Sequence, residues 1–436
     1  MLKDIKHNNI IKHNKVNKIM EGITLTDIIW DANCFVLDLT NEKRVSIEDN
    51  EFSDKPSRQS KSLVDIKMYK KLSEIKDKIS NCNHWDKWSK LINPYDKVPN
   101  LAKNKNSRDY YKFYEIIKYY NLTQDLPNNC SSGHLGESSI PCAKALTYFL
   151  PKLNWYAEKI TSEIPHTRSF TDFSQLENEN VKDENGYSRI ISSNKELTFL
   201  ENLKNFKDSV GKVHFFSADV LIDTSHDPNN QEQLIFHAIF AQIVYALSMQ
   251  ELGGVFIIKI FDCLTRPSCQ LIYYLTNFYE SVGIIKPRTS RYSNSEKYIV
   301  AKKFKGIDSE ELIKLEDILT NWKDDLYCRV LGIELPLDIE TQFFNYNNKL
   351  IENQYNYIEK IIKCSYNEEE IPEKQLEAIQ NRKALDFCSN FGILVNLVDQ
   401  EIASICKHLK KKKISVSYLK NVMICEKCLC LLIVKV

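Results

Sequence analysis

The sequence predicts an α/β fold built on a largely parallel sheet that is covered by helices on both faces. Four short apolar runs are typical of buried strands, at 212–218, 253–261, 282–286 and 297–304. Helical stretches at 230–250 and 268–281 separate the first three runs, and such alternation favours parallel pairing. Only about ten residues connect 286 to 297, too few for a helical crossover, so we expect the last two strands to be antiparallel.

Helical patterns flank this region on both sides. Apolar residues recur at helical spacing in four stretches, at 64–80, 108–120, 336–363 and 372–411. Polar segments at 48–62 and 93–106 are predicted to be linkers. The chain is therefore expected to consist of an N-terminal helical extension (1–104), an α/β domain (105–306) and a mainly helical C-terminal domain (307–436).

Composition excludes several classes of protein. The 436 residues are 43% hydrophobic, which is typical of a globular chain, and 59 Lys+Arg nearly balance 58 Asp+Glu. No overall basic field indicates nucleic-acid binding, so any such site must be a local patch. No apolar run approaches the eighteen or so residues of a membrane span, and thirteen scattered cysteines suggest reduced thiols. We expect a cytoplasmic or nuclear protein that is not secreted and not membrane-bound.

Four charged residues lie where this architecture would gather them. Asp219 follows the strand at 212–218, Lys259 lies near the end of the next strand, Glu296 precedes the last strand, and Lys112 lies on the helix before the sheet. Ligands of such sheets bind beyond the carboxyl ends of the strands. A lysine near the end of a buried strand is costly unless a carboxylate pairs with it. The alternative for Lys259 is a strand-end lysine whose ammonium group reaches solvent.

Each of these residues lies in a longer motif. The motifs are "NSRDYYKFYEI" (106–116), "SADVLIDTSHDPNNQEQL" (217–234), "GGVFIIKIFDCLT" (253–265) and "KPRTSRYSNSEKYIV" (286–300). Together they resemble the FtsJ-like ribose 2′-O-methyltransferases, specifically the Adrift-type cap methyltransferases of eukaryotes and large DNA viruses. The resemblance covers roughly 105–306. It implies a Rossmann-like S-adenosylmethionine-dependent methyltransferase fold with N-terminal and C-terminal helical extensions.

The resemblance implies an RNA 2′-O-methyltransferase, best read as one that acts on the mRNA cap, with S-adenosyl-L-methionine as cofactor and no metal. Its catalytic residues would be Lys112, Asp219, Lys259 and Glu296. A ribose hydroxyl must lose its proton as it attacks the methyl group, and Lys259 is the implied base. A lysine is a base near neutral pH only if burial or a nearby cation lowers its pKa, and Lys112 would supply that cation. The two carboxylates would offset the burial of two cations.

The loop "GHLGESSIPCAK" (133–144) corresponds to the family's methyl-donor loop. The implied cofactor-binding residues are Gly136, Glu137, Ser138, Trp155 and Asp219. The family's Pro-Gly pair is absent from the loop, and at the next acidic motif only Glu196 is a stand-in. A catalytically inactive RNA-binding or capping-complex scaffold therefore stays open as an alternative, as does a methyltransferase of rRNA or tRNA.

The expected partners are capped mRNA or other RNA and, in addition, other capping enzymes. Candidate RNA-binding residues surround Glu296 and the first catalytic helix: Arg108, Lys286, Arg288, Ser290 and Arg291. Trp85, Trp88 and Tyr292 could stack on a base or pack in the core. A Cys-x-x-Cys motif in 425–430 is read as reduced cysteines, and the lysines of 407–413 as a solvated helix end or a phosphate contact.

Overall fold

The computed structural model describes residues 35–39, 62–136, 139–161, 188–198, 200–220, 224, 230–322, 333–366, 371–395, 416–419, 422–425 and 430–433. Several sequence features that were singled out lie outside the described side chains, namely 48–61, Glu137, Ser138, Glu196, 407–413 and 425–430.

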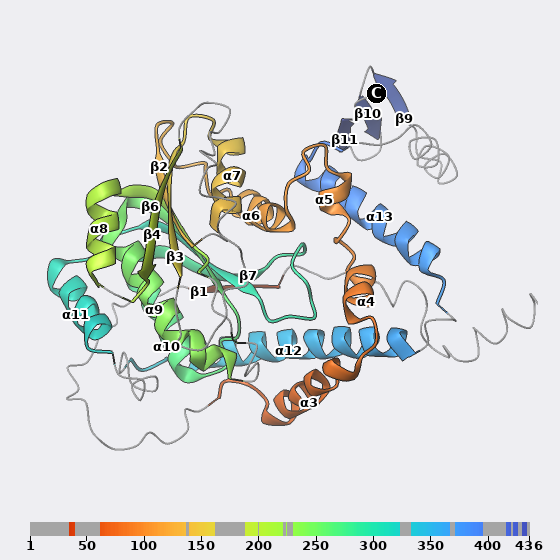
Figure 1. Ribbon diagram of the computed structural model, residues 1–436, viewed down its shortest axis with the longest axis horizontal. Helices are drawn as coiled ribbons and strands as arrows, with labels where there is room; N and C mark the ends of the chain where they lie inside the picture. Colours follow the sequence, from red (N-terminus) through yellow and green to blue (C-terminus); the bar gives the residue numbers. More distant parts are fainter. Residues whose placement is uncertain are drawn as a thin grey trace, which may run out of the picture.

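A mixed sheet of eight strands, in the order β1-β7-β8-β6-β5-β2-β3-β4, lies at the centre of the molecule (Figure 1). Its strands are β1 (Phe35–Leu39), β2 (Ser131–Leu135), β3 (Asn154–Thr161), β4 (Ser188–Glu196), β5 (Val213–Ala218), β6 (Gln250–Ile260), β7 (Tyr279–Lys286) and β8 (Lys297–Phe304). Strands β4, β3, β2, β5 and β6 are parallel. The predicted α/β class and the four predicted strands are confirmed.

Strand β8 runs antiparallel to both of its neighbours, β6 and β7. The predicted antiparallel pair is therefore confirmed, and it has a consequence for the site. Because β6 and β7 both oppose β8, the amino end of β8 lies at the same edge of the sheet as the carboxyl ends of β5, β6 and β7. Strand β1, which was not predicted, pairs antiparallel with β7 at the sheet's edge.

Helices cover both faces of the sheet. Helices α6 (Arg108–Tyr119) and α7 (Ile140–Phe149) pack on one face, and α8 (Leu200–Val210), α9 (Gln231–Met249), α10 (Arg266–Tyr274) and α11 (Ser309–Thr320) cover the other (Figure 1). Consecutive strand residues alternate between the two cores: Phe215 joins the α6/α7 side and Phe216 the α9 side. Among the described residues only α9 is long and apolar enough to span a membrane, and it is the central core helix, with 78% of its apolar window buried in the protein.

The helices that precede and follow the sheet domain in sequence pack against one another. Helices α3 (Ile66–Asp77) and α4 (Trp85–Ile92) contact α12 (Leu337–Tyr366), and α5 (Val98–Leu101) contacts α13 (Glu373–Phe391). Trp88 and Tyr292 are fully buried in the core between these helices, with the Tyr292 ring 5.0 Å from that of Tyr357. Of the two alternatives for these aromatic residues, base stacking is therefore wrong for Trp88 and Tyr292.

Two predicted boundaries are wrong. The segment 93–106 is not a free linker, because it contains α5 and the buried side chains of Asn93 and Val98. The helix predicted over 372–411 ends at Phe391, since Gly392 follows with a left-handed φ of 68° that closes the helix. Further along, β9 (Val416–Leu419), β10 (Val422–Cys425) and β11 (Cys430–Ile433) form a small antiparallel sheet.

Candidate active site

Helix α6 supplies the first lysine. The Ser107 hydroxyl accepts a hydrogen bond from the Tyr110 amide at 3.2 Å, which fixes the helix start at Arg108. Most of the helix is apolar and buried against the sheet, and Lys112 lies on this buried face with 3% of its surface exposed. Its Nζ lies 2.6 Å from Oε1 of Glu296 and 2.7 Å from Oδ1 of Asp109. Lys112 is thus a buried cation held by two carboxylates.

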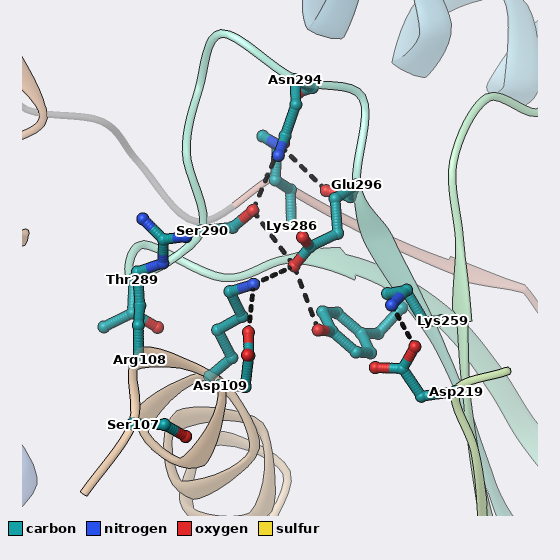
Figure 2. Close-up of polar contacts among 12 residues, drawn as sticks. Ser107, Arg108, Asp109, Asp219, Lys259, Lys286, Thr289, Ser290, Asn294 and Glu296 are labelled. Atoms are coloured by element: carbon teal, nitrogen blue, oxygen red, sulfur yellow. Dashed lines mark hydrogen bonds and ion pairs between the residues drawn. The ribbon is translucent and has the colours of Figure 1, made fainter. Parts of the chain in front are cut away.

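Strands β5 and β6 supply the second ion pair. Ala218 pairs with Ile258 in the parallel ladder, so Asp219, one residue later, lies level with Lys259. The Lys259 ammonium group forms an ion pair with Oδ1 of Asp219, and both side chains are more than nine-tenths buried (Figure 2). The alternative of a strand-end lysine that reaches solvent is wrong for Lys259.

Glu296 lies beside the Lys259–Asp219 ion pair at the carboxyl edge of the sheet (Figure 2). Glu296 comes directly before β8, and its Oε1 accepts a hydrogen bond from the Tyr298 hydroxyl at 3.0 Å. Tyr298 is also the cross-strand partner of Lys259. The structure therefore brings together all four predicted catalytic residues, and it adds Tyr298, which donates a hydrogen bond to Glu296 and lies opposite Lys259 in the ladder.

Charge and burial act against each other in this cluster. Burial is the largest influence on Glu296 and would raise its pKa, but Lys112, Lys259 and Lys286 outweigh it and lower the pKa to about 2. Burial would likewise lower the pKa of Lys112, yet Glu296 and Asp109 raise it above its ordinary value. Lys112 and Glu296 are therefore a permanently charged pair at neutral pH.

Asp219 differs from Glu296 in the direction of its shift. Burial raises the pKa of Asp219 above its ordinary range, and the neighbouring Lys259 only partly offsets this. The charge of Glu296 also raises the pKa of Asp219, and that of Lys112 lowers it, so the two ion pairs are near enough to influence each other. The two lysines thus pair with different carboxylates. In the Asp219–Lys259 pair the cost of burying the charged carboxylate is less fully offset than in the Glu296–Lys112 pair.

A loop from Pro287 to Glu296 closes one side of the cluster. The ammonium group of Lys286 is buried and donates to the backbone oxygens of Asn294 and Glu296, both at 2.8 Å. Ser290 is also fully buried. Burial contradicts the prediction that Lys286 and Ser290 contact RNA, because their polar groups are occupied by the protein itself.

The three arginines that were predicted to bind RNA keep part of their surface exposed. Arg108 forms an ion pair with Asp96 at 3.3 Å. Arg291 is close enough to Arg108 for the two charges to repel, and burial together with this repulsion lowers the pKa of Arg291. The charge of Glu296 also acts on Arg291, so these two arginines lie on the side of the cluster near Glu296. Arg108, Arg288 and Arg291 all stay predicted RNA contacts.

Gly136 directly follows β2 and lies beside β3 and the end of β5. The Gly136 amide donates to the Glu158 carbonyl, and the Asp219 amide donates to the Leu135 carbonyl, both at 3.0 Å. Gly136 has a left-handed φ of 81°, and a Cβ there would lie 2.6 Å from the Asp219 carbonyl oxygen. Only glycine fits this junction.

The other predicted cofactor contacts fare differently. Glu137 and Ser138 lie outside the described residues. Trp155 does not reach the edge of the sheet: it is the second residue of β3, 2% exposed, with its ring against His134 in the core. The prediction that Trp155 binds the cofactor is therefore wrong. Glu158, three residues further along β3 and level with Leu135, lies at that edge.

The residues at this edge fit a methyl donor of the S-adenosylmethionine type. Such a donor carries a sulfonium cation and ribose hydroxyls, which suit carboxylates at the ends of parallel strands. Asp219, directly after β5, and Glu158, level with the last residue of β2, supply two buried carboxylates, and Gly136 has no side chain at this position. The loop lacks the family's Pro-Gly pair, but Gly136 still has the left-handed backbone and the close approach to Asp219 that only glycine allows.

Sequence reasoning missed three residues of the site, Glu115, Glu158 and Tyr298. Glu115 is buried in α6 one turn after Lys112, and a carboxylate on the apolar face of a helix was a signal that could have identified it. Tyr298 follows Glu296 by two residues and so faces the same side of β8.

Comparison with known proteins shows what the chain is similar to. Residues 106–304 match the sequence model of the FtsJ-like methyltransferases. The chain is 35% identical over 170 residues to cap-specific mRNA (nucleoside-2′-O-)-methyltransferase 1 of Bos taurus, covering 37% of this chain and 20% of that protein. It is 36% identical over 110 residues to cap-specific mRNA (nucleoside-2′-O-)-methyltransferase 2 of Pongo abelii, covering 25% and 14%. It is 28% identical over 229 residues to a probable methyltransferase of African swine fever virus, covering 46% and 52%. The chain thus spans from about one seventh to about half of the length of these relatives.

Proposed function

We propose that this chain is an S-adenosylmethionine-dependent RNA 2′-O-methyltransferase acting on capped mRNA, and the match of residues 106–304 to the FtsJ-like methyltransferases supports this proposal. The observation that carries the proposal is the pair of buried ion pairs, Lys259–Asp219 and Lys112–Glu296, at the edge of the sheet where such folds bind ligands. The similarity to cap-specific methyltransferases supports the cap as the site of reaction.

The two lysines have different roles in the proposed reaction. Glu296 and Asp109 keep Lys112 protonated, so Lys112 acts as a fixed cation near the reacting hydroxyl. Lys259 is then the proposed proton acceptor: only its neutral amine form can take the proton of the ribose 2′-hydroxyl, and the ammonium group that results is paired with Asp219. When bound, S-adenosylmethionine supplies an electrophilic methyl group on its sulfonium. Gly136, Glu158 and Asp219 would hold this donor.

Binding of the methyl donor separates the proposal from an inactive scaffold. Calorimetry with S-adenosylmethionine, and separately with its demethylated product, should show saturable binding to the full chain. No heat at saturating concentrations would exclude the methyltransferase and favour an RNA-binding or capping-complex role.

A single substitution tests the proposed base. Lys259→Ala should lower the rate of methyl transfer to capped RNA by about 10²–10⁴-fold, the usual contribution of a positioned base, and leave donor binding intact. Lys303→Ala is the matched control, because Lys303 is an exposed lysine of the adjacent strand β8 that pairs with Glu280 at the surface. Activity of Lys259→Ala close to that of the control would remove Lys259 from this role.

The substrate class is tested with matched RNAs. Transcripts that differ only in the presence of the 5′ cap should differ in methyl incorporation, with the capped RNA preferred and the label found on a ribose 2′-oxygen. Equal labelling of uncapped RNA would favour an rRNA or tRNA substrate instead. An mRNA substrate would place the protein in the nucleus or cytoplasm, where other capping enzymes are its proposed partners.

A further inference from the structure

We propose that Glu115 is a positioning residue: it anchors the loop 287–296 to helix α6 and thereby sets the geometry of the Lys112–Glu296 pair. Its consequence for catalysis rests on the proposed function, whereas the anchoring itself does not. Glu115 acts through the loop that carries Glu296, because its side-chain hydrogen bonds go to Arg288 and Thr289 in that loop.

The contacts of Glu115 are those of an anchor. Its side chain is 1% exposed, and its two oxygens accept three hydrogen bonds from adjacent loop residues. Oε1 accepts from the Arg288 amide at 2.9 Å, and Oε2 accepts from the Thr289 amide at 3.1 Å and the Thr289 hydroxyl at 2.9 Å. These bonds satisfy two backbone donors that would otherwise be buried without partners.

The same helix holds both ends of the loop. Glu115 follows Lys112 by three residues, close to one helical turn, so both side chains point from one face of α6 toward the loop. Glu115 holds the loop's start at Arg288 and Thr289, and Lys112 meets its end at Glu296. A short, rigid helix segment therefore sets the distance between these two points.

Contacts within the loop connect its start to its end. The Ser290 amide donates to the Pro287 carbonyl at 3.1 Å, and Lys286 bonds to the backbone oxygens of Asn294 and Glu296. The Ser290 hydroxyl also approaches Oε1 of Glu296 at 3.5 Å. A displacement of Arg288 and Thr289 would consequently move Glu296 relative to Lys112.

The chain offers a matched control for this anchor. Glu232, at the start of α9, accepts hydrogen bonds from the Leu264 amide at 2.9 Å, the Thr265 amide at 3.0 Å and the Thr265 hydroxyl at 2.7 Å. Glu232 therefore holds the segment after β6 as Glu115 holds the segment after β7, but its segment does not carry Glu296. Burial raises the pKa of both carboxyl groups, which shows that each anchor is maintained against a desolvation cost.

A double-mutant cycle on the rate of methyl transfer tests the proposal. Glu115→Gln keeps the side-chain shape but turns an amide group toward a backbone donor. We expect kcat to fall about tenfold in the wild-type background and less than twofold in the Glu296→Gln background, with KM for the methyl donor unchanged. Glu232→Gln should lower kcat by the same factor in both backgrounds. Equal losses for Glu115→Gln in both backgrounds would show that Glu115 acts independently of Glu296 and would overturn the proposal.

A second measurement requires no activity. Amide hydrogen exchange in the loop 287–296 should speed up in Glu115→Gln and remain unchanged in Glu232→Gln. Unchanged exchange in the loop of Glu115→Gln would overturn the proposed anchor, whether or not the enzyme is active. A wild-type chain without methyl transfer would refute the proposed function, but the exchange measurement would still decide whether Glu115 anchors the loop. If Glu115→Gln does not fold, Thr289→Val removes one of the three donors and should give a smaller change in the same direction.

Discussion

Acid should destabilise this protein in part through Glu296, and the effect can be calculated from its environment. Nearby lysines lower the pKa of Glu296 in the folded chain to about 2, against an ordinary value of 4.5. Because the folded pKa is the lower one, ionised Glu296 contributes stability above pH 4.5, and this contribution is lost as the pH falls from 4.5 toward 2. At 1.36 kcal/mol per pH unit the full contribution is about 3 kcal/mol.

Denaturant unfolding of the wild-type chain and of Glu296→Gln, each at pH 6 and pH 3, measures this quantity. The wild-type free energy of unfolding should fall by about 2 kcal/mol more than that of Glu296→Gln, since only part of the range down to pH 2 is crossed. Glu280→Gln serves as the control, because the Glu280 side chain is 59% exposed and pairs with a surface lysine. The pH dependence of Glu280→Gln should follow the wild type. Parallel losses in the wild type and in Glu296→Gln would refute the assignment of Glu296 as a strongly stabilised carboxylate.

Two further substitutions test the site's supporting structure. Gly136→Ala should destabilise the chain by about 1–3 kcal/mol and weaken donor binding in calorimetry, because its Cβ would meet the Asp219 carbonyl. Gly211→Ala is its control, since Gly211 has a similar φ of 75° but a Cβ there would meet no atom within 4 Å. A loss of stability as large as that of Gly136→Ala would show that the backbone angle alone matters. Burial lowers the pKa of Lys286 from 10.5 to about 7, so the folded chain binds fewer protons than the unfolded chain between these values. Wild-type stability should therefore rise from pH 7 to pH 9.5 relative to Lys286→Met in denaturant unfolding, and the same pH dependence in both would contradict the lowered pKa of Lys286.

Local patterns determined most of the central fold. Strands β5 to β8 and helices α6 and α9 were predictable because short apolar runs and helical spacing depend on neighbouring residues alone. Pairing between β1 and β7 was not, since Leu37 and Ile284 are 247 positions apart and no local signal joins them. The end of α13 at Gly392 was readable from sequence, because glycine tolerates the left-handed backbone that closes a helix.

The sequence by itself indicated four charged residues that the fold brings together: Lys112, Asp219, Lys259 and Glu296 come from the helix before the sheet and from strand ends that the predicted topology places at one edge. Only the tertiary structure decided how these charges are divided, with Glu296 assigned to Lys112 and Asp219 to Lys259. It also showed that Lys286 is buried, although its motif suggested a surface cation. Ion pairing and desolvation depend on distances of a few ångströms between segments far apart in sequence, and those distances exist only once the helices have packed on the sheet.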